Sequence, residues 1–380
     1  MSAPVHLLTH EYPPFTGGIG MYVVETARAL ARSGAAVTVW APDYGRAGPA
    51  EEDSFEVVRV PMRGKQGWSC RLRMASALRE AFPGGRIAGR VILAEPGPLR
   101  MWLYASPLKL PLPEVLIPVL HGTEISQIGR RPLEKRLFRG LVRRSERIGV
   151  VSQAVRSRLL EVAPEGKTLT GLIPGAVRSA WRCLPGAKAE KAVPGDFEIL
   201  QVGRISPRKG QLHLLEAVAR MPEKWRRRIH LRIVGPAGKG AYAEAVAKRA
   251  RSLDCRVSLE GALSEEALRE MYFGARLLVM PSQPYRRSVE GLGLALLEGA
   301  HFGCPVIASE TGGIPEAMLP GKSGLLVPPG DREALAKAII RVMDNPVEAA
   351  RMGAAGAAFV RETFSWEKNG RFLQGSVDLE

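Results

Sequence analysis

Cysteine, aromatic residues and long apolar runs are all scarce in this sequence, and each absence excludes a class of protein. The four cysteines lie far apart in 380 residues and form no CxxC pair, which excludes a zinc signature and a disulfide framework. No apolar run approaches the ~18 residues of a membrane span. The N-terminus has neither the basic nor the apolar region of a signal peptide. We therefore expect a cytoplasmic chain.

Aromatic residues make up only 6% of the chain, whereas 54 Lys and Arg face 38 Asp and Glu, a net charge of +16. Such an excess favours anionic partners, which include nucleotides, nucleic acids and anionic membrane surfaces. Single-strand binders interleave aromatic and basic residues, and neither that pattern nor a recognition motif occurs here. A basic nucleic-acid-binding protein remains an alternative, but we expect no nucleic-acid partner.

Short apolar strands alternate with helices along the whole chain, with glycine or proline in the loops. This pattern predicts the α/β class, with parallel sheets covered on both faces. The series of strands restarts after a polar, proline-rich stretch at 182–196. We therefore predict two doubly wound, Rossmann-like domains at 1–180 and 181–364, with a last helix at about 365–380 that returns to the first. A cleft between two such domains is the expected ligand site.

Two loops of the N-terminal half follow strand ends and carry residues suited to ligand binding. Gly17, Gly18 and Gly20 separate the first strand from the first helix, and glycines let backbone amides approach an anion at a helix N-terminus. His121 ends a later strand, in "VLHGTEIS". A tight turn and a structural histidine are the alternative interpretations, because neither feature forms a specific motif.

The stretch "QVGRISPRKGQ" (201–211) predicts a more specific site. A strand ends at Val202 and Gly203 allows a turn. Arg204 and Lys209 then flank the loop that opens the next helix. Two cations and exposed amides at such a junction suit a phosphate group. The loop is not a Walker A loop, since GxxxxGK[ST] is absent, and a solvated basic loop is the alternative.

The stretch "EGLGLALLEG" places Glu290 and Glu298 on either side of an apolar segment. Carboxylates are rarely buried without a partner, so either the protein or a ligand must supply one. If 294–300 is helical, residues eight apart are separated by about 12 Å of rise. A carboxylate can accept two hydroxyl donors, so this spacing suits hydroxyl-bearing rings on both sides of a diphosphate. A helix cap or a salt-bridged pair is the alternative.

The order of these elements resembles the retaining glycosyltransferases of family 4. The resemblance rests on the Gly17-Gly18 turn, His121, the VGR…KG loop, the Glu290-x7-Glu298 pair and "TGGIPE". It implies the GT-B fold, in which two Rossmann-like domains face each other across a cleft. It also implies transfer of a hexose from a UDP- or GDP-sugar to a glycan, lipid-linked or small-molecule acceptor, in bacterial cell-surface polysaccharide or glycolipid synthesis. The N-terminal domain would then bind the acceptor and the C-terminal domain the nucleotide sugar.

The resemblance also implies roles for individual residues. Arg204 and Lys209 would hold the donor diphosphate, and Glu298 would hold the ribose. Glu290 would bind hydroxyls of the transferred sugar, with His121 beside that sugar. The expected catalytic residues are thus Arg204, Lys209, Glu290 and His121. The other donor-binding positions that the resemblance implies are Gly17, Gly18, Gly203, Leu263, Leu292, Gly293, Leu294, Gly312 and Gly313.

No DxD motif occurs in the sequence, which fits a site without a metal ion. Fixed cations would replace a divalent ion in stabilising the charge that grows on the leaving group. We therefore expect neither a metal nor another cofactor, and the nucleotide sugar is a substrate. A sugar-nucleotide epimerase or phosphorylase on the same architecture is the alternative enzyme, although an epimerase is not expected to combine the two glutamates with the VGR…KG loop.

Residues 130–147 carry eight Arg and Lys against two Glu, with Leu133, Leu137 and Leu141 at every fourth position. This pattern predicts a basic amphipathic helix. Two interpretations remain open: the apolar stripe packs on the sheet, or the helix docks the protein on an anionic bilayer. The second would place the enzyme at the inner membrane face, where a lipid-linked acceptor lies.

Overall fold

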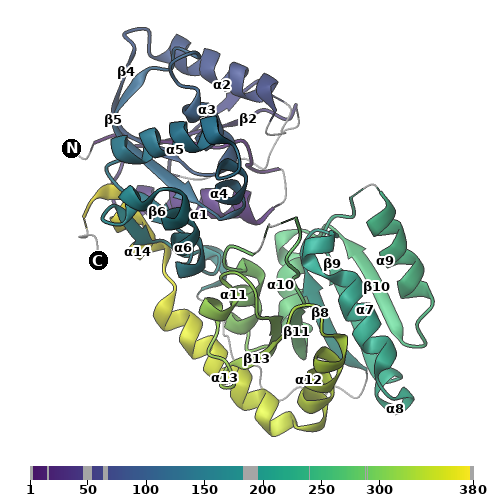
Figure 1. Ribbon diagram of the computed structural model, residues 1–380. Coiled ribbons are helices and arrows are strands. Elements are labelled where there is room, and N and C mark those ends of the chain that lie inside the picture. The colour runs from purple at the N-terminus through teal and green to yellow at the C-terminus, as the bar shows by residue number, and fades with distance from the viewer. Residues whose placement is uncertain are drawn as a thin grey trace. The chain divides into compact units, whose positions relative to one another are not determined.

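The computed structural model describes residues 3–14, 17–45, 54–62, 67–182, 196–238, 240–286, 288 and 290–376. The chain divides into two compact units (Figure 1). Unit 1 comprises Met1–Gly175 and Ser365–Glu380, and unit 2 comprises Ala176–Phe364. Each unit contains one all-parallel sheet with helices on its faces, which confirms the predicted α/β class with two doubly wound sheets.

Unit 1 is built on a seven-stranded sheet with the order β3-β2-β1-β4-β5-β6-β7. Its strands are β1 (Val5–Leu8), β2 (Val37–Pro42), β3 (Glu56–Val60), β4 (Arg86–Leu93), β5 (Leu112–Leu120), β6 (Ile148–Val150) and β7 (Thr170–Leu172). The direction of strand addition reverses between β1 and β4. Ligands of such sheets bind beyond the carboxyl ends of the strands, at this switch point.

The helices of unit 1 include one from the far end of the sequence. They are α1 (Gly18–Arg32), α2 (Trp68–Ala81), α3 (Pro96–Leu103), α4 (Thr123–Ile128), α5 (Pro132–Arg144), α6 (Gln153–Val162) and α14 (Trp366–Gln374). Ser365 caps the start of helix α14, and its hydroxyl accepts from the amide of Lys368. It packs on α1, where the rings of Trp366 and Tyr22 meet edge to face with centroids 5.1 Å apart.

Unit 2 is built on a six-stranded sheet with the order β10-β9-β8-β11-β12-β13. Its strands are β8 (Phe197–Val202), β9 (Ile229–Val234), β10 (Arg256–Gly261), β11 (Leu277–Met280), β12 (Val306–Ser309) and β13 (Gly324–Val327). Its helices are α7 (Gln211–Arg220), α8 (Glu223–Arg226), α9 (Ala241–Arg251), α10 (Glu265–Gly274), α11 (Leu294–His301), α12 (Arg332–Asp344) and α13 (Pro346–Thr363). The switch point lies between β8 and β11, so the loops after these two strands are the expected ligand loops.

The basic helix predicted at 130–147 is α5, and it is shorter than the charge pattern suggested. Phe138, Leu141 and Val142 are buried, so most of the apolar stripe packs inside unit 1, where α5 contacts α3 and α4. Leu133 is the exception, because 63% of its surface is exposed. Across the described residues, no helix combines the length and the apolar character that a bilayer span requires.

Candidate active site

The loop that follows β8 in unit 2 is held in place by two buried glutamines. The Gln201 side-chain amide donates to the carbonyl of Lys209 at 2.7 Å. The Gln211 side chain donates to the carbonyl of Arg204 at 3.1 Å and accepts from the amide of Ser206 at 3.2 Å. Because both ends of the loop are fixed, the side chains of its last residues leave the backbone from defined positions.

Gly210 joins this loop to α7, and its geometry requires glycine. Its φ is +71°, in the left-handed region, and a Cβ there would lie 1.9 Å from the carbonyl oxygen of Pro281. Pro281 directly follows β11. The backbones after β8 and β11 therefore touch at the switch point of the unit 2 sheet.

Glu290 lies at this junction and is paired with two cations. Its Oε1 is 2.7 Å from Lys209 Nζ and 2.5 Å from Arg208 Nη1, and only 6% of the residue is exposed. Burial alone would raise the pKa of Glu290, but Lys209 and Arg208 outweigh it and lower the pKa to about 2. The carboxylate is therefore ionised, and the two cations around it leave a net positive charge that suits an anionic ligand.

Arg204 was the predicted companion of Lys209, and the structure places it differently. Its side chain is exposed and has no carboxylate partner within the part of the chain that the structure describes. The second cation on Glu290 is Arg208, which the sequence analysis did not single out. The signal was present, since Arg208 directly precedes Lys209 in "PRKG". Arg204 remains available to bind a diphosphate.

Glycine turns surround Glu290. Gly293 has a φ of +102° at the start of α11, and a Cβ there would lie 2.9 Å from the Met280 Cε. Gly313 donates its amide to the carbonyl of Glu290 at 3.1 Å, which joins the loop after β12 to the site. Gly312 beside it has a φ of +58°. The predicted donor residues of the 290–294 and 312–313 segments are therefore brought together, with Leu292 buried.

Glu298 is also buried, and both its carboxylate oxygens are engaged by the protein. Oε1 accepts from Arg178 Nε at 3.0 Å, and Oε2 accepts from the Tyr272 hydroxyl at 2.8 Å. The sequence analysis missed both partners. Arg178 also reaches Glu265, with Nη1 and Oε2 3.4 Å apart, at the start of α10. Leu263 lies two residues before that contact, in the loop between β10 and α10.

The predicted residues of unit 1 lie at the carboxyl edge of its own sheet. Gly17 and Gly18 begin α1, and Gly18 is exposed. His121 follows β5, with its Nε2 3.0 Å from the carbonyl oxygen of Ala94 and its ring edge-on to Tyr22. A carbonyl only accepts, so Nε2 carries the proton and Nδ1 is the basic nitrogen of the neutral ring. Glu124 accepts from the amides of His121 and Gly122 and fixes this turn.

A second carboxylate at this edge, Glu95, is fully buried. It follows β4, and it accepts from the amides of His10 at 2.9 Å and Gly97 at 2.8 Å. Burial raises the pKa of Glu95 to about 8, although the two amides oppose the shift. Burial also lowers the pKa of His10 to about 4, with a smaller contribution from Arg71. At neutral pH this pair is therefore mostly uncharged.

We expect Glu95 to give the stability of the protein a pH dependence. Between pH 4.5 and about 8 the unfolded chain is ionised at this position and the native protein is protonated, so stability falls as the pH rises. The slope can reach about 1.4 kcal/mol per pH unit. Denaturant unfolding of Glu95→Gln across this range should show a flatter profile than the wild type, and Glu80→Gln, at an exposed site on α2, should not. An unchanged slope in Glu95→Gln would contradict the assignment.

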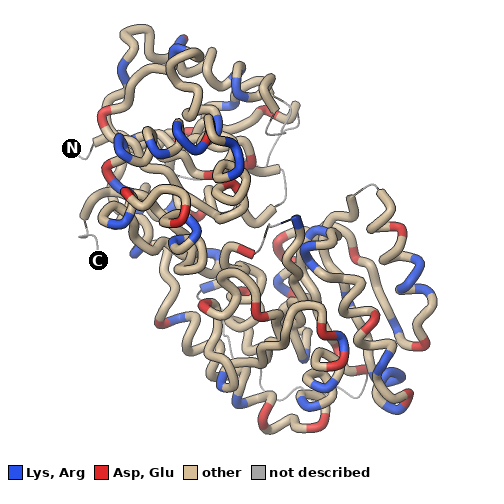
Figure 2. The backbone as a smooth tube through the Cα atoms, viewed as in Figure 1, with Lys and Arg blue, Asp and Glu red and all other residues tan. Residues whose placement is uncertain are grey.

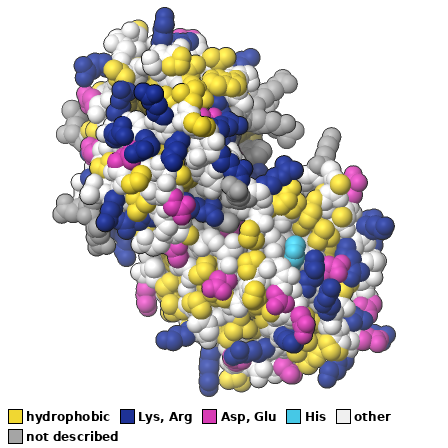
Figure 3. All heavy atoms as spheres, viewed as in Figure 1, with side chains coloured by type: hydrophobic (Ala, Val, Ile, Leu, Met, Phe, Trp, Pro, Cys, Tyr) yellow, Lys and Arg dark blue, Asp and Glu magenta, His cyan; other side chains and the backbone are white. Residues whose placement is uncertain are grey.

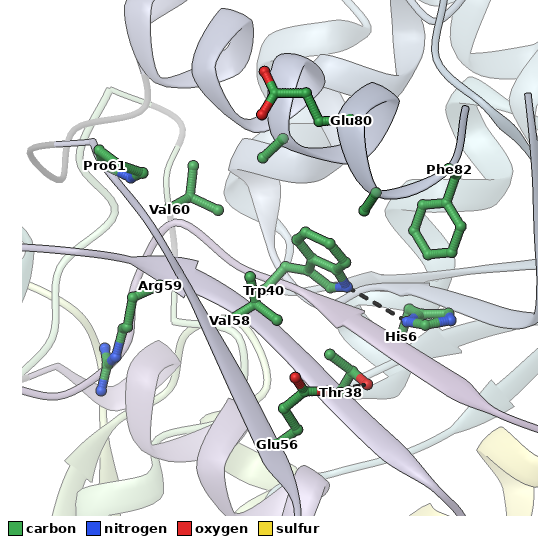
Figure 4. Close-up of a pocket in the computed structure, with 12 residues that line it drawn as sticks. His6, Thr38, Trp40, Glu56, Val58, Arg59, Val60, Pro61, Glu80 and Phe82 are labelled. Atoms are coloured by element: carbon green, nitrogen blue, oxygen red, sulfur yellow. Dashed lines mark hydrogen bonds between the residues drawn. The ribbon is translucent and has the colours of Figure 1, made fainter.

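Unit 1 also contains a pocket of about 610 Å³ between its sheet and α2 (Figure 4). Trp40 and Phe82 form its apolar wall, and Trp40 Nε1 donates to His6 Nδ1 at 3.4 Å. Thr38 and Glu56, near the amino ends of β2 and β3, line it as well. None of the predicted site residues lines this pocket, so we assign it no role in the reaction.

No three His, Cys, Asp or Glu side chains gather as a metal site would need within the described ranges. The expected independence of metal stays a prediction. The cations that would replace a metal are Arg208 and Lys209 on Glu290, with Arg204 exposed nearby in sequence.

Two doubly wound sheets, with a cation–carboxylate cluster at the switch point of the second, are features expected of a GT-B glycosyltransferase. The model of "Glycosyltransferase Family 4" matches residues 16–177, and that of "Glycosyl transferases group 1" matches residues 187–359. The two matches together cover most of both units. The chain belongs to glycosyltransferase family 4, and it is an enzyme that transfers a sugar from a nucleotide-sugar donor.

Curated relatives match over different lengths. A GDP-mannose-dependent alpha-(1-6)-phosphatidylinositol monomannoside mannosyltransferase of Mycobacterium tuberculosis is 29% identical over 98% of this chain and 98% of its own. The protein of the same name from Mycolicibacterium smegmatis is 28% identical over 97% and 96%. A D-inositol 3-phosphate glycosyltransferase of Streptomyces scabiei is 35% identical, but over 54% of this chain and 45% of its own.

Solved structures agree on the fold. Sucrose-phosphate synthase from Thermosynechococcus elongatus has a TM-score of 0.76 and 22% identity, covering 98% of both chains. The Anabaena protein HepE in complex with UDP and glucose has a TM-score of 0.76 and 19% identity, covering 98% of this chain and 99% of its own. At these identities the likeness shows the GT-B fold alone.

Proposed function

We propose that the enzyme transfers mannose from GDP-mannose to a lipid-linked acceptor with an anionic headgroup, at the inner face of a membrane. The observation that carries this proposal is the end-to-end match to the mannosyltransferases named above, which includes unit 1. The inositol phosphate glycosyltransferases match over about half of the chain only.

In the proposed reaction, negative charge grows on the diphosphate as the bond to the sugar breaks. Lys209 and Arg204 bind that diphosphate, and the fixed cations lower the barrier without a metal ion. Glu290 accepts hydrogen bonds from hydroxyls of the mannose. Arg208 and Lys209 keep its carboxylate ionised. Lys209 thus contacts both the sugar-binding carboxylate and the leaving group. We infer retention of configuration from the family alone.

The other predicted residues complete the proposed donor site. Glu298 accepts hydrogen bonds from the ribose hydroxyls, and the loop that contains Leu263 binds the base. His121 offers its basic Nδ1 to the sugar. The amides of Gly203 and Gly313 already donate to the carbonyls of Val234 and Glu290, so these two glycines shape the loops of the proposed site. The remaining positions would offer backbone amides to the phosphates and the sugar, and they are Gly17, Gly18, Leu292, Gly293, Leu294 and Gly312.

A surface of unit 1 supports a membrane-bound acceptor. Trp68, Leu72 and Leu133 are 52%, 53% and 63% exposed, and we call them the apolar anchor. The ring of Trp68 lies 5.0 Å from that of Tyr104, whose hydroxyl is 3.5 Å from Glu134 Oε1, the neighbour of Leu133. Helices α2 and α5, which carry the three anchor residues, are therefore linked through Tyr104 in the segment after α3. Figure 3 shows hydrophobic side chains gathered over α2 and α3 beside the basic side chains of α5.

Helix α5, which carries Leu133, and the turn before it are rich in cations. Arg130, Lys135, Arg136 and Arg144 have no ion-pair partner within the described part of the chain, and Figure 2 shows the basic residues concentrated along α5. Burial lowers the pKa of Arg71, and the nearby charge of Arg100 lowers it further. Exposed apolar side chains within a field of unpaired cations suit an anionic bilayer, where each well-placed cation contributes up to ~1 kcal/mol.

Removing the apolar anchor should weaken membrane binding. The triple variant Trp68→Ser/Leu72→Ser/Leu133→Ser is expected to bind phosphatidylcholine vesicles containing phosphatidylinositol at least about tenfold more weakly in a sedimentation assay, because three side chains no longer enter the bilayer. The matched control is Val347→Ser/Leu319→Ser, which removes exposed apolar residues of unit 2. Equal binding by the triple variant and the wild type would exclude this surface.

The proposed function is tested by offering donors and acceptors in combination. Purified enzyme with GDP-mannose and vesicles containing phosphatidylinositol monomannoside should move radiolabel into the lipid phase, in the presence of a chelator. UDP-glucose with the same vesicles, and GDP-mannose with free D-inositol 3-phosphate, should give little product. Transfer only from UDP-glucose would overturn the donor assignment, and transfer only to the free inositol phosphate would overturn the lipid acceptor.

A further inference from the structure

Arg178 makes three contacts that converge on one end of the candidate site. Its Nε lies 3.0 Å from Glu298 and its Nη1 lies 3.4 Å from Glu265. Its guanidinium group stacks over the ring of Trp181 at 4.6 Å. The side chain is only 15% exposed. Burial opposes the charge of Arg178, but Glu298 and Glu265 favour it, and the pKa is raised overall. Arg178 is therefore a fixed cation between two carboxylates.

The segment that carries Arg178 is itself anchored to α11. Trp181 is 2% exposed and packs among the rings of Tyr272 and Phe302, with centroids 6.0 and 5.7 Å away. Its carbonyl oxygen is 3.0 Å from His301 Nε2, at the end of α11. Glu298 lies on the same helix. The rings of Trp181, Tyr272 and Phe302 thus hold the guanidinium of Arg178 beside the carboxylate of Glu298.

Tyr272 completes the arrangement on the other oxygen of Glu298. Burial raises the pKa of the Tyr272 hydroxyl well above its usual value, and Glu298 adds to the shift, so the hydroxyl stays protonated and donates. A carboxylate offers about four acceptor positions, and the residues that the structure describes use one on each oxygen of Glu298. The orientation of the carboxylate is then set, while acceptor positions remain for two neighbouring hydroxyl groups.

We propose that Arg178 is a positioning residue for the nucleoside end of the donor. It orients Glu298 toward the ribose hydroxyls, and through Glu265 it fixes the start of α10 and the loop with Leu263 that seats the base. Tyr272 assists it on Glu298. This inference rests on the proposed donor site. It predicts that Arg178 contributes to binding of the nucleoside and contributes nothing to binding of the diphosphate, which belongs to Arg204 and Lys209.

The test compares three probes by isothermal titration: GDP, 2′,3′-dideoxy-GDP and inorganic pyrophosphate. Arg178→Met should bind GDP about tenfold more weakly than the wild type, the loss expected when a hydrogen-bonded charge is misplaced. Its affinity for pyrophosphate should be unchanged. The loss should be much smaller for 2′,3′-dideoxy-GDP, which has no ribose hydroxyls for Glu298 to accept. Lys209→Met should weaken all three.

A double-mutant cycle separates positioning from a direct contact. If Arg178 acts through Glu298, then Arg178→Met/Glu298→Gln should bind GDP no more weakly than Glu298→Gln alone. Additive losses would overturn the positioning role. The double variant also neutralises the carboxylate that Arg178→Met leaves buried without a cation, so the melting temperatures of the two variants together show whether that charge destabilises the single variant.

Arg232→Met is the matched control. Arg232 bridges Glu198 and Glu260 on the sheet of the same unit, and its loss should leave GDP binding unchanged. If the wild type binds GDP and Arg178→Met binds it equally well, the role of Arg178 is overturned and the donor site stands. Failure of the wild type to bind either GDP or pyrophosphate would overturn the donor site, and with it this inference.

Discussion

Replacing Glu290 by glutamine is expected to lower the turnover of sugar transfer about 100- to 1,000-fold, the range seen when one transition-state contact is lost. The amide keeps the size of the side chain but loses the negative charge that strengthens the hydrogen bonds from the sugar hydroxyls. Lys209 and Arg208 lose their carboxylate partner in the variant and are free to face a diphosphate. GDP should therefore bind at least as tightly as to the wild type.

Steady-state transfer and titration with GDP measure the two halves of this prediction. Glu333→Gln, on the exposed face of α12, is the matched control and should behave as the wild type. Melting temperatures without ligand show whether Glu290→Gln remains folded. Turnover close to that of the wild type would remove Glu290 from the reaction, and a large loss of GDP affinity would place it on the nucleotide instead.

Replacing Lys209 by methionine is expected to weaken GDP binding about 10- to 100-fold and to reduce transfer further. Lys209 is mostly buried, and its Nζ is 2.7 Å from Glu290, so it is the one cation proposed to touch both the sugar-binding carboxylate and the diphosphate. Burial lowers its pKa, while Glu290 opposes that shift. An anionic diphosphate would further favour the charged form.

The matched control for Lys209→Met is Lys337→Met, which removes an exposed lysine of α12 that pairs with Glu333. It should change neither GDP affinity nor transfer. Arg204→Met adds a comparison within the same loop, and it should weaken GDP binding without disturbing the Glu290 cluster, because Arg204 makes no contact with that carboxylate. If Lys209→Met binds GDP as tightly as the wild type, the loop at 203–210 does not bind the diphosphate.

The fold was predictable because its signals are local. Strands of three to nine residues and helices with glycine-bearing loops recur along both halves, and parallel sheets with two covered faces follow from that alternation. The limits of α5 were less predictable. Its charges continue beyond Arg144, whereas the helix ends where Ser145 adopts an extended conformation. Charge pattern alone does not show where a helix stops.

The candidate site was predictable only where its residues are close in sequence. The spacing of Glu290 and Glu298 on either side of a glycine turn is visible in one short stretch, and so is Lys209 in the loop just before α7. Arg208 was overlooked because the sequence does not show that two adjacent cations, Arg208 and Lys209, reach the same distant carboxylate. The Gln201 and Gln211 side chains that hold the loop give no such signal.

Arg178 and Tyr272 could not be predicted from sequence at all. They are 120 and 26 residues away from Glu298, and their contacts arise only when the segment with Trp181 packs against α10 and α11. The apolar anchor has the same origin. Trp68 and Leu72 lie on α2 and Leu133 lies on α5, two helices that are linked through Tyr104 in the segment after α3, and no single stretch of sequence contains all three.

The central claim is that the loop at 203–210 and Glu290 form a nucleotide-sugar site that needs no metal. The measurement that tests it most directly is the melting temperature of the purified protein with millimolar GDP, UDP or ADP in the presence of a chelator, since a ligand that binds only the native state raises it. The account predicts a clear increase with GDP that is lost in Lys209→Met and kept in Lys337→Met. No increase with any of the three nucleotides would contradict it.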